Sequence, residues 1–118
     1  MIDIRENGGG ELSVFGDIAD ILLPKGEMFY AMDRHGNKNN VITSDEECLN
    51  IPYCVLVNGL SASASEAFAG ALRDMANAKI VGTKTYGKGI MQTSYYLENG
   101  GVFKLTTGKY YLPRVFIL

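Results

Sequence analysis

Residues 53–66 read YCVLVNGLSASASE, an apolar run followed by a series of small and hydroxyl side chains. A continuous β-prone run such as Tyr53–Val57 is typical of a strand buried on both faces of a sheet. The spacing after it predicts a helix from about Ala64 to Asn77, and Lys79–Val81 predicts the next buried strand. This order implies two parallel strands joined by a helical crossover. The residues expected on the inner face of the helix are Phe68, Leu72 and Met75.

The sequence on either side of this unit predicts one more helix and several more strands. Apolar residues recur at helical spacing between Leu12 and Leu23, and Pro24 and Gly26 follow them as stop signals. Two alternating segments around the turn Glu98–Gly101 predict a β-hairpin. The expected fold class is therefore α/β. The other expected features are a strand end at Ile2–Ile4, a strand at Glu27–Met32, a polar turn at Asp33–Lys38, an exposed connection at 43–52, and hairpin strands at Met91–Leu97 and Val102–Thr107.

Composition places the chain among ordinary globular domains. Its 118 residues are 47% hydrophobic and 20% charged, so we expect a single domain with a hydrophobic core. The formal net charge of −2, without a basic run, gives no reason to expect nucleic acid as a partner. The apolar runs are too short to span a membrane, and the charged N-terminus does not resemble a signal peptide. Cys48 and Cys54 are expected to be reduced, and no His or Cys cluster suggests a metal site.

Ser63 precedes the predicted helix, and Glu66 follows three residues later. Ser-x-x-Glu is the capping box, in which both side chains satisfy backbone N–H groups, and capping alone is the commoner role of this pattern. Here the serine also follows a buried strand, among small residues that let another backbone approach closely. A strand, a tight turn and a serine before a helix resemble a nucleophile elbow, although Gly59-x-Ser61-x-Ser63 departs from Gly-x-Ser-x-Gly. Ser63 is therefore a candidate nucleophile.

A serine nucleophile needs a base, and the sequence offers one histidine. His35 lies in a polar turn and is expected to be solvated, so a Ser-His-Asp triad is not expected. Lys88, in the glycine-rich segment Gly82–Gly89, is the best-placed alternative. A lysine base must be neutral, so its pKa of roughly 10.4 must fall by about three units, or about 4 kcal/mol, which burial can supply. Without the serine motif, Lys88 would be interpreted as a solvated turn residue.

The same glycine-rich segment nearly matches a nucleotide-binding loop of the form Gly-x4-Gly-Lys-Ser/Thr. Gly89 stands where that loop has a hydroxyl for Mg²⁺. Ile90–Leu97 alternates like a strand, where a helix should receive the phosphates. Nucleotide binding is therefore not expected.

Four separated motifs resemble the C-terminal processing (tail-specific) serine peptidases, over nearly the whole chain from Ile2 to about Tyr111. The motifs are Asp3-Ile4-Arg5-x-Asn7-x-Gly9-Gly10, Val57-Asn58-Gly59-x-Ser61-Ala62-Ser63-Ala64-Ser65-Glu66, Gly70-Ala71-Leu72-x-Asp74 and Gly82-x-x-Thr85-Tyr86-Gly87-Lys88-Gly89-x-x-Gln92. The resemblance implies a ClpP/crotonase-like protease core that needs no metal or organic cofactor. It implies a Ser-Lys-Gln site in which Ser63 is the nucleophile, Lys88 the general base and Gln92 the residue that orients the lysine. It further implies an oxyanion hole formed by the backbone N–H groups of Ala64 and Gly9, with Glu66 in support.

The activity that this resemblance implies is hydrolysis of peptide bonds near the apolar C-terminal tails of proteins, through an acyl-enzyme. Family members usually work outside the cytoplasm, in the periplasm or at the membrane face. The chain departs from the family pattern, since Asn7-Gly8-Gly9-Gly10 replaces Asn-Pro-Gly-Gly. No PDZ domain is expected within residues 1–118, nor the strand and helix that normally precede Asp3. We therefore expect a partial peptidase core, either catalytic or reduced to a non-catalytic binding module, that self-associates through uncovered core surface.

Overall fold

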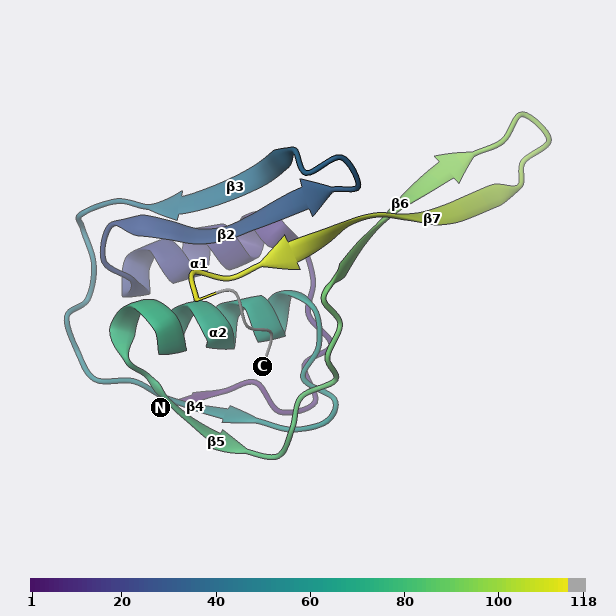
Figure 1. The fold of residues 1–118 in the computed structure, drawn as a ribbon. Helices are drawn as coiled ribbons and strands as arrows, with labels where there is room; N and C mark the ends of the chain where they lie inside the picture. Colours follow the sequence, from purple (N-terminus) through teal and green to yellow (C-terminus); the bar gives the residue numbers. More distant parts are fainter. Residues whose placement is uncertain (115–118) are drawn as a thin grey trace.

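The structure is a computed structural model that describes residues 1–114, in which two sheets enclose a layer of two helices (Figure 1). One sheet is parallel, with the strand order β1–β4–β5. The other is antiparallel, with the order β3–β2–β7–β6. The strands are β1 (Ile2–Asp3), β2 (Gly26–Asp33), β3 (Lys38–Ser44), β4 (Cys54–Val57), β5 (Lys79–Gly82), β6 (Ile90–Tyr96) and β7 (Val102–Tyr111). The helices are α1 (Leu12–Leu22) and α2 (Ala64–Ala76).

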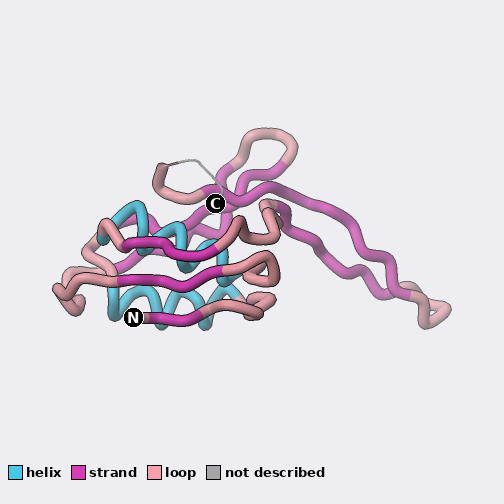
Figure 2. Tube along the Cα trace, turned by 90° about the horizontal axis from the view of Figure 1, so that it is seen from below, coloured by secondary structure: helices cyan, strands magenta, loops and turns pink. Residues whose placement is uncertain are grey.

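The predicted strand–helix–strand unit is present as β4, α2 and β5. The two strands are parallel, and Val55 of β4 pairs with Ile80 of β5. The expectations that β4 is buried on both faces and that β5 is buried are wrong. Along β4, Val55 and Val57 are buried while Cys54 and Leu56 are only half-buried, because the helices cover one face of this sheet (Figure 2). In β5, Lys79 and Val81 are exposed, because β5 is an edge strand of the described sheet.

The hydrophobic core lies where the helix layer meets the two sheets. Helix α2 is buried along most of its length, which places its start deep between the sheets. Phe68 and Leu72 of its predicted inner face are buried, and Met75 is half-buried. Burying a side chain such as Leu72 contributes about 1.5–3 kcal/mol, so this packing fixes the position of the helix start. The largest fully buried apolar residues are Phe29, Leu23, Met28, Leu72, Leu112 and Val55.

Strand β3 was not expected from the sequence, which suggested a turn up to Lys38 and an irregular connection from residue 43. Its residues are mostly polar and exposed, and it pairs with β2 as an edge strand. The turn before it is held by the Asp33 carboxylate, which accepts hydrogen bonds from the backbone N–H groups of His35 and Asn37 at 2.8 and 2.9 Å. This antiparallel pairing depends on the turn and on backbone hydrogen bonds, so the alternation of apolar residues does not indicate it.

The β6–β7 hairpin projects from the body of the protein as a two-stranded ribbon (Figure 1). It gives the molecule principal extents of 51 × 29 × 21 Å. Tyr95 pairs with Phe103, and Leu105 lies two residues further along the same strand, so these three side chains share one face. Each is about half exposed, at 46–53%. We call these three residues the apolar ribbon face.

Candidate active site

Ser63 lies at the sharp turn between β4 and α2, where its backbone has φ 58° and ψ −122°. This conformation is uncommon for a residue other than glycine and is typical of strained functional turns. Ser61 anchors the turn, because its buried hydroxyl donates to the Ile4 carbonyl at 2.7 Å and accepts the Asn58 N–H at 3.0 Å. Among these serines, Ser61 is therefore structural, whereas Ser63 is half-buried at the surface of a cavity.

Glu66 joins the helix start to the loop that contains Lys88. Its side chain is fully buried, and its carboxylate accepts hydrogen bonds from three backbone N–H groups. The donors are Ser63 at 2.9 Å, Gly87 at 2.6 Å and Lys88 at 3.0 Å. The predicted capping interaction with Ser63 is thus present, and the other two bonds extend it to the lysine loop. One side chain therefore sets the relative position of the two residues predicted to carry the chemistry.

The loop between β5 and β6 is attached to the rest of the protein at both ends. The Tyr86 N–H donates to the Ser61 carbonyl at 3.0 Å, next to the serine turn. At the other end, the Tyr110 N–H donates to the Gly89 carbonyl at 3.2 Å. Because strand β6 follows this loop, no helix N-terminus stands ready for phosphates there. The strand that the sequence predicted after this segment is thus present.

Ser63, Lys88 and Gln92 line one cavity of about 190 Å³. They come from the start of α2, the loop after β5 and the base of β6, respectively. Within residues 1–114 no hydrogen bond joins any two of the three side chains, and their catalytic roles stay predictions. The other lining residues are Leu12, Phe29, Ala64, Ala67, Ile90, Met91, Lys104 and Tyr110.

Gly9 lies against the serine turn, as its predicted place in the oxyanion hole requires. A side chain is excluded there, because a Cβ atom on Gly9 would lie 2.5 Å from the Ala62 carbonyl oxygen and 2.8 Å from the Ala64 nitrogen, and φ is +89°. The Gly9 N–H donates to Asn7 Oδ1 at 2.9 Å. The Ala64 N–H has no hydrogen-bond acceptor among the described residues, as expected in the first turn of a helix.

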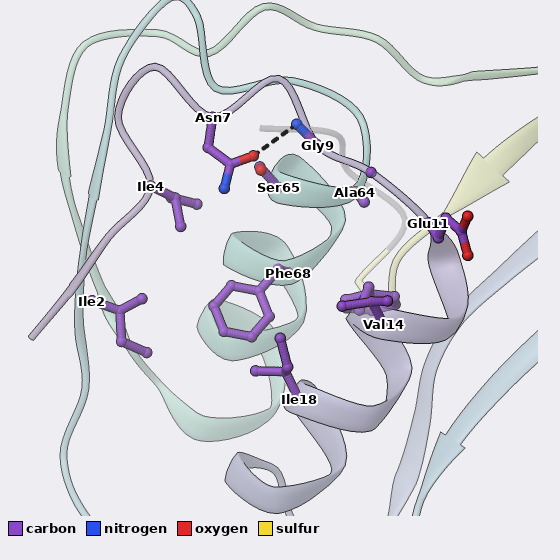
Figure 3. A pocket seen from close by; sticks show the side chains of 12 residues that line it. Ile2, Ile4, Asn7, Gly9, Glu11, Val14, Ile18, Ala64, Ser65 and Phe68 are labelled. Carbon is purple, nitrogen blue, oxygen red and sulfur yellow. Dashed lines mark hydrogen bonds between the residues drawn. The ribbon is translucent and has the colours of Figure 1, made fainter.

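A second and larger cavity, of about 450 Å³, adjoins the first at Ala64. Figure 3 shows Phe68 between Ile2 and Ile4 on one side and Ile18 on the other. Gly9 also lines this cavity, so it lies beside the predicted oxyanion hole. Its wall is mostly apolar, with Asn7, Glu11 and Ser65 as its polar residues, and such a wall favours an apolar side chain.

The remaining candidates from the sequence lie away from these cavities. His35 is exposed in the β2–β3 turn, where its Nε2 accepts a hydrogen bond from Arg34 Nε at 3.0 Å. Cys48 and Cys54 are both free thiols. No group of three or more His, Cys, Asp or Glu within residues 1–114 is arranged to hold a metal ion. In the same range, no helix combines the length and apolarity of a membrane span.

Sequence reasoning missed two polar side chains of the smaller cavity, Lys104 and Tyr110. Both belong to β7, which the sequence placed only as far as Thr107, whereas the strand continues to Tyr111. The buried Tyr110 and Leu112, two positions apart, carry the alternation that could have extended the prediction. The Tyr110 hydroxyl oxygen is the one buried side-chain polar atom in the described part of the chain without a hydrogen-bond partner.

Comparisons with known proteins show the family and the fold of this chain. The model of the family described as Peptidase family S41 matches residues 1–115. The chain is 40% identical over 114 residues to a carboxyl-terminal-processing protease of Synechocystis sp., covering 97% of the chain and 27% of that protein. It is 41% identical to a carboxy-terminal-processing protease of Bartonella bacilliformis, covering 96% of the chain and 26% of that protein. The chain thus spans about a quarter of the length of these relatives.

Solved structures resemble the chain over the same range. A photosystem II D1 C-terminal processing protease superposes with a TM-score of 0.88 and 35% identity, covering 98% of this chain and 30% of that one. A lipoprotein from Streptococcus agalactiae superposes with a TM-score of 0.78 and 25% identity, covering 98% of this chain and 44% of that one. The predicted α/β class, a partial peptidase core, and the predicted family are therefore confirmed. This chain belongs to peptidase family S41, the C-terminal processing serine peptidases.

Proposed function

We propose that this chain forms the catalytic core of a serine endopeptidase that hydrolyses peptide bonds near the C-terminal tails of proteins. The observation that carries the proposal is the cavity shared by Ser63, Lys88 and Gln92. The strained turn at Ser63 and the Glu66 carboxylate, which holds both the turn and the lysine loop, support it. A nucleophile and a base on two separately anchored segments are what acyl transfer requires.

In the proposed reaction, Ser63 Oγ attacks the carbonyl carbon of the scissile peptide bond while the neutral Lys88 Nζ takes the serine proton. Lys88 then gives this proton to the leaving amine, and the acyl chain stays on Ser63 as an ester. Water hydrolyses the ester with Lys88 again acting as the base. The developing oxyanion accepts a hydrogen bond from the Ala64 N–H at the N-terminus of α2, where the helix dipole favours negative charge. Gly9 supplies the second N–H when the Asn7 side chain turns away from it.

The preference for apolar tails follows from the larger cavity. In a bound peptide, the side chain before the scissile bond is attached one carbon from the carbonyl group that enters the oxyanion hole. The cavity of about 450 Å³ starts at the same two residues, Gly9 and Ala64. Transfer of an apolar side chain from water into it is favourable, by about 25 cal/mol for each Å² buried.

The test is cleavage of an unstructured protein with an apolar C-terminal tail, with the products identified by mass spectrometry. We expect cleavage by the parent chain and none by Ser63→Ala or Lys88→Ala. Lys84→Ala is the matched control, because Lys84 is an exposed lysine of the same loop and should be dispensable. A substrate that differs only in a charged tail should be cleaved more slowly.

Two results would contradict the proposal. Equal cleavage by the parent and by Ser63→Ala would point to a contaminating protease. No cleavage by any variant, together with binding of the apolar-tailed substrate, would favour a non-catalytic binding module with the same fold.

We further propose that the chain self-associates and acts outside the cytoplasm. The apolar ribbon face and the exposed Val81 on edge strand β5 are surfaces that a second copy can cover. Light scattering coupled to size-exclusion chromatography should show a dimer or larger species at micromolar concentration, and a clean monomer would contradict this. The extracytoplasmic location rests on the family, and fractionation of the source cells tests it.

A further inference from the structure

Among residues 1–114, the Tyr110 hydroxyl is the one buried side-chain polar group without a hydrogen-bond partner. Tyr110 is only 5% exposed, and its hydroxyl oxygen is buried without a hydrogen-bond partner. A buried hydroxyl without a partner destabilises the folded state, because it loses its bonds to water and gains none. Exceptions of this kind in folded proteins call for an explanation, and a partner that arrives only during function is one.

Tyr110 is held in a fixed position beside the lysine loop. Its ring packs against Phe29 with centroids 5.4 Å apart, and its backbone N–H donates to the Gly89 carbonyl at 3.2 Å. Its side chain lines the cavity of about 190 Å³ together with those of Ser63 and Lys88. The ring of Tyr110 is therefore fixed at the wall of the cavity that the lysine and the serine also line.

We propose that Tyr110 is a positioning residue whose hydroxyl oxygen accepts a hydrogen bond from the ε-amine of Lys88. This proposal rests on the proposed role of Lys88 as the base. A neutral amine has two N–H donors and one lone pair, and the lone pair must face the hydroxyl of Ser63. Tyr110 accepts one N–H and Gln92 Oε1 accepts the other, so that the lone pair is directed at the serine.

The same contacts serve the protonated lysine. When the serine proton reaches Lys88 Nζ, the O–H bond of Ser63 breaks, an N–H bond forms and the amine becomes an ammonium with three donors. Tyr110 and Gln92 keep their two bonds, and the third donor faces the leaving amine nitrogen, to which it returns the proton. The number of protons is balanced at each step, and the reaction needs no further reactant.

The electrostatic surroundings keep Tyr110 a neutral acceptor. Burial, with a smaller effect from the Glu66 carboxylate, raises the pKa of the Tyr110 phenol well above its usual value. A neutral oxygen stabilises the ammonium without the strong pull of an ion pair, so the lysine can still lose its proton. The charged side chains around Lys88 are Glu66, which accepts its backbone N–H, and Lys104, which lines the cavity from β7.

The test compares Tyr110→Phe with Tyr111→Phe in the full chain. Tyr111 is the matched control, because it is the next residue of β7 and its ring stacks on Tyr30, with centroids 5.2 Å apart. The primary measurement is the pKa of Lys88 with a saturating apolar peptide bound, from an NMR titration of ¹³C-labelled lysine assigned with Lys88→Arg. Loss of an acceptor destabilises the ammonium, so we expect the Lys88 pKa to fall by about one unit in Tyr110→Phe, a tenfold change in its proton affinity. It should not change in Tyr111→Phe.

A second measurement separates positioning from structural support. Tyr110→Phe removes a hydroxyl that bonds to nothing in the free chain, so its melting temperature should equal or exceed that of the parent. In a chain that cleaves substrate, kcat should fall about tenfold with KM nearly unchanged, and the acid limb of the pH profile should move to lower pH.

Two results would overturn the role of Tyr110: the same Lys88 pKa in both tyrosine variants, or a lower melting temperature in Tyr110→Phe. The titration needs no turnover. If the parent chain cleaves nothing, the proposed peptidase activity fails, while the titration still decides whether Tyr110 contacts Lys88.

Discussion

Replacement of Glu66 by glutamine tests whether one buried carboxylate holds the site together. Glutamine has nearly the same shape, but one of the two side-chain oxygens becomes an NH₂ group, which can only donate. In the structure Oε2 accepts the N–H groups of Ser63 and Lys88, and Oε1 accepts that of Gly87. Either orientation of the amide therefore places its NH₂ group against at least one backbone N–H.

The expected loss can be worked from these three bonds. A hydrogen bond to a charged group contributes about 1.5–3 kcal/mol, and a buried donor left without an acceptor costs about 1–3 kcal/mol. If the amide in Glu66→Gln keeps the two bonds of Oε2 and loses the one of Oε1, the loss of this one charged hydrogen bond should lower the free energy of unfolding by about 1.5–3 kcal/mol. This is a large share of the roughly 5–15 kcal/mol that stabilises an ordinary domain.

The assay is equilibrium unfolding in urea, followed by far-ultraviolet circular dichroism, for the parent, Glu66→Gln and Glu46→Gln. Glu46 is the matched control, because its side chain is 78% exposed and pairs with Lys25 at the surface, where an ion pair contributes little. Amide exchange should also accelerate at Gly87 and Lys88 in Glu66→Gln only. If Glu66→Gln unfolds at the same urea concentration as Glu46→Gln, the carboxylate does not hold the site and the reasoning is refuted.

Three further predictions concern the turn, the sheet and acid stability. Ser61→Ala should lower the free energy of unfolding by about 1–3 kcal/mol, since it removes two buried hydrogen bonds, and a loss below this range in urea unfolding would contradict the structural role. Gly82→Ala should reduce soluble expression and the melting temperature, because its Cβ would lie 1.9 Å from a carbonyl oxygen of β4 at φ +138°, whereas Gly8→Ala, with open space around it, should not. The hydrogen bonds from Arg5 lower the pKa of Asp3 to about 2, so this pair stabilises the fold above pH 4 and loses that effect as the pH falls toward 2. Asp3→Asn should therefore show a weaker fall in stability over this pH range, and identical acid unfolding curves would argue against the pair.

The sequence predicted best the elements whose signals lie close together along the chain, which are the two helices. The expected helix from Leu12 to Leu23 corresponds to α1, Leu12–Leu22, and the expected helix from Ala64 to Asn77 corresponds to α2, Ala64–Ala76. Periodicity and stop signals lie within a few residues of each other, so they are visible in one sequence. Strand β3 was missed because its pairing depends on a turn and on β2, and the exposure of β5 depends on which strand lies beside it.

In the candidate site, too, features with a local sequence signal were predicted, and those that depend on distant contacts were not. Local motifs indicated Ser63 and Lys88, the family resemblance added Gln92, and the structure brings all three to one cavity. The bonds from Glu66 to Gly87 and Lys88 join residues more than 20 positions apart, and no local pattern reports them. Tyr110 was missed for the same reason, since an unpaired hydroxyl is a property of the folded surroundings.

The backbone conformation of Ser63 also bears on how this sequence can evolve. At φ 58° and ψ −122°, a non-glycine residue is held at a cost of roughly 1–3 kcal/mol, so Ser63→Gly would stabilise the fold. Selection for stability and selection for the hydroxyl therefore act in opposite directions on a single codon. A lineage that stops using the hydroxyl gains by drifting to glycine at this position, whereas a lineage that cleaves peptides must keep serine. The residue found at position 63 in descendants of this chain thus records whether the site has stayed in use.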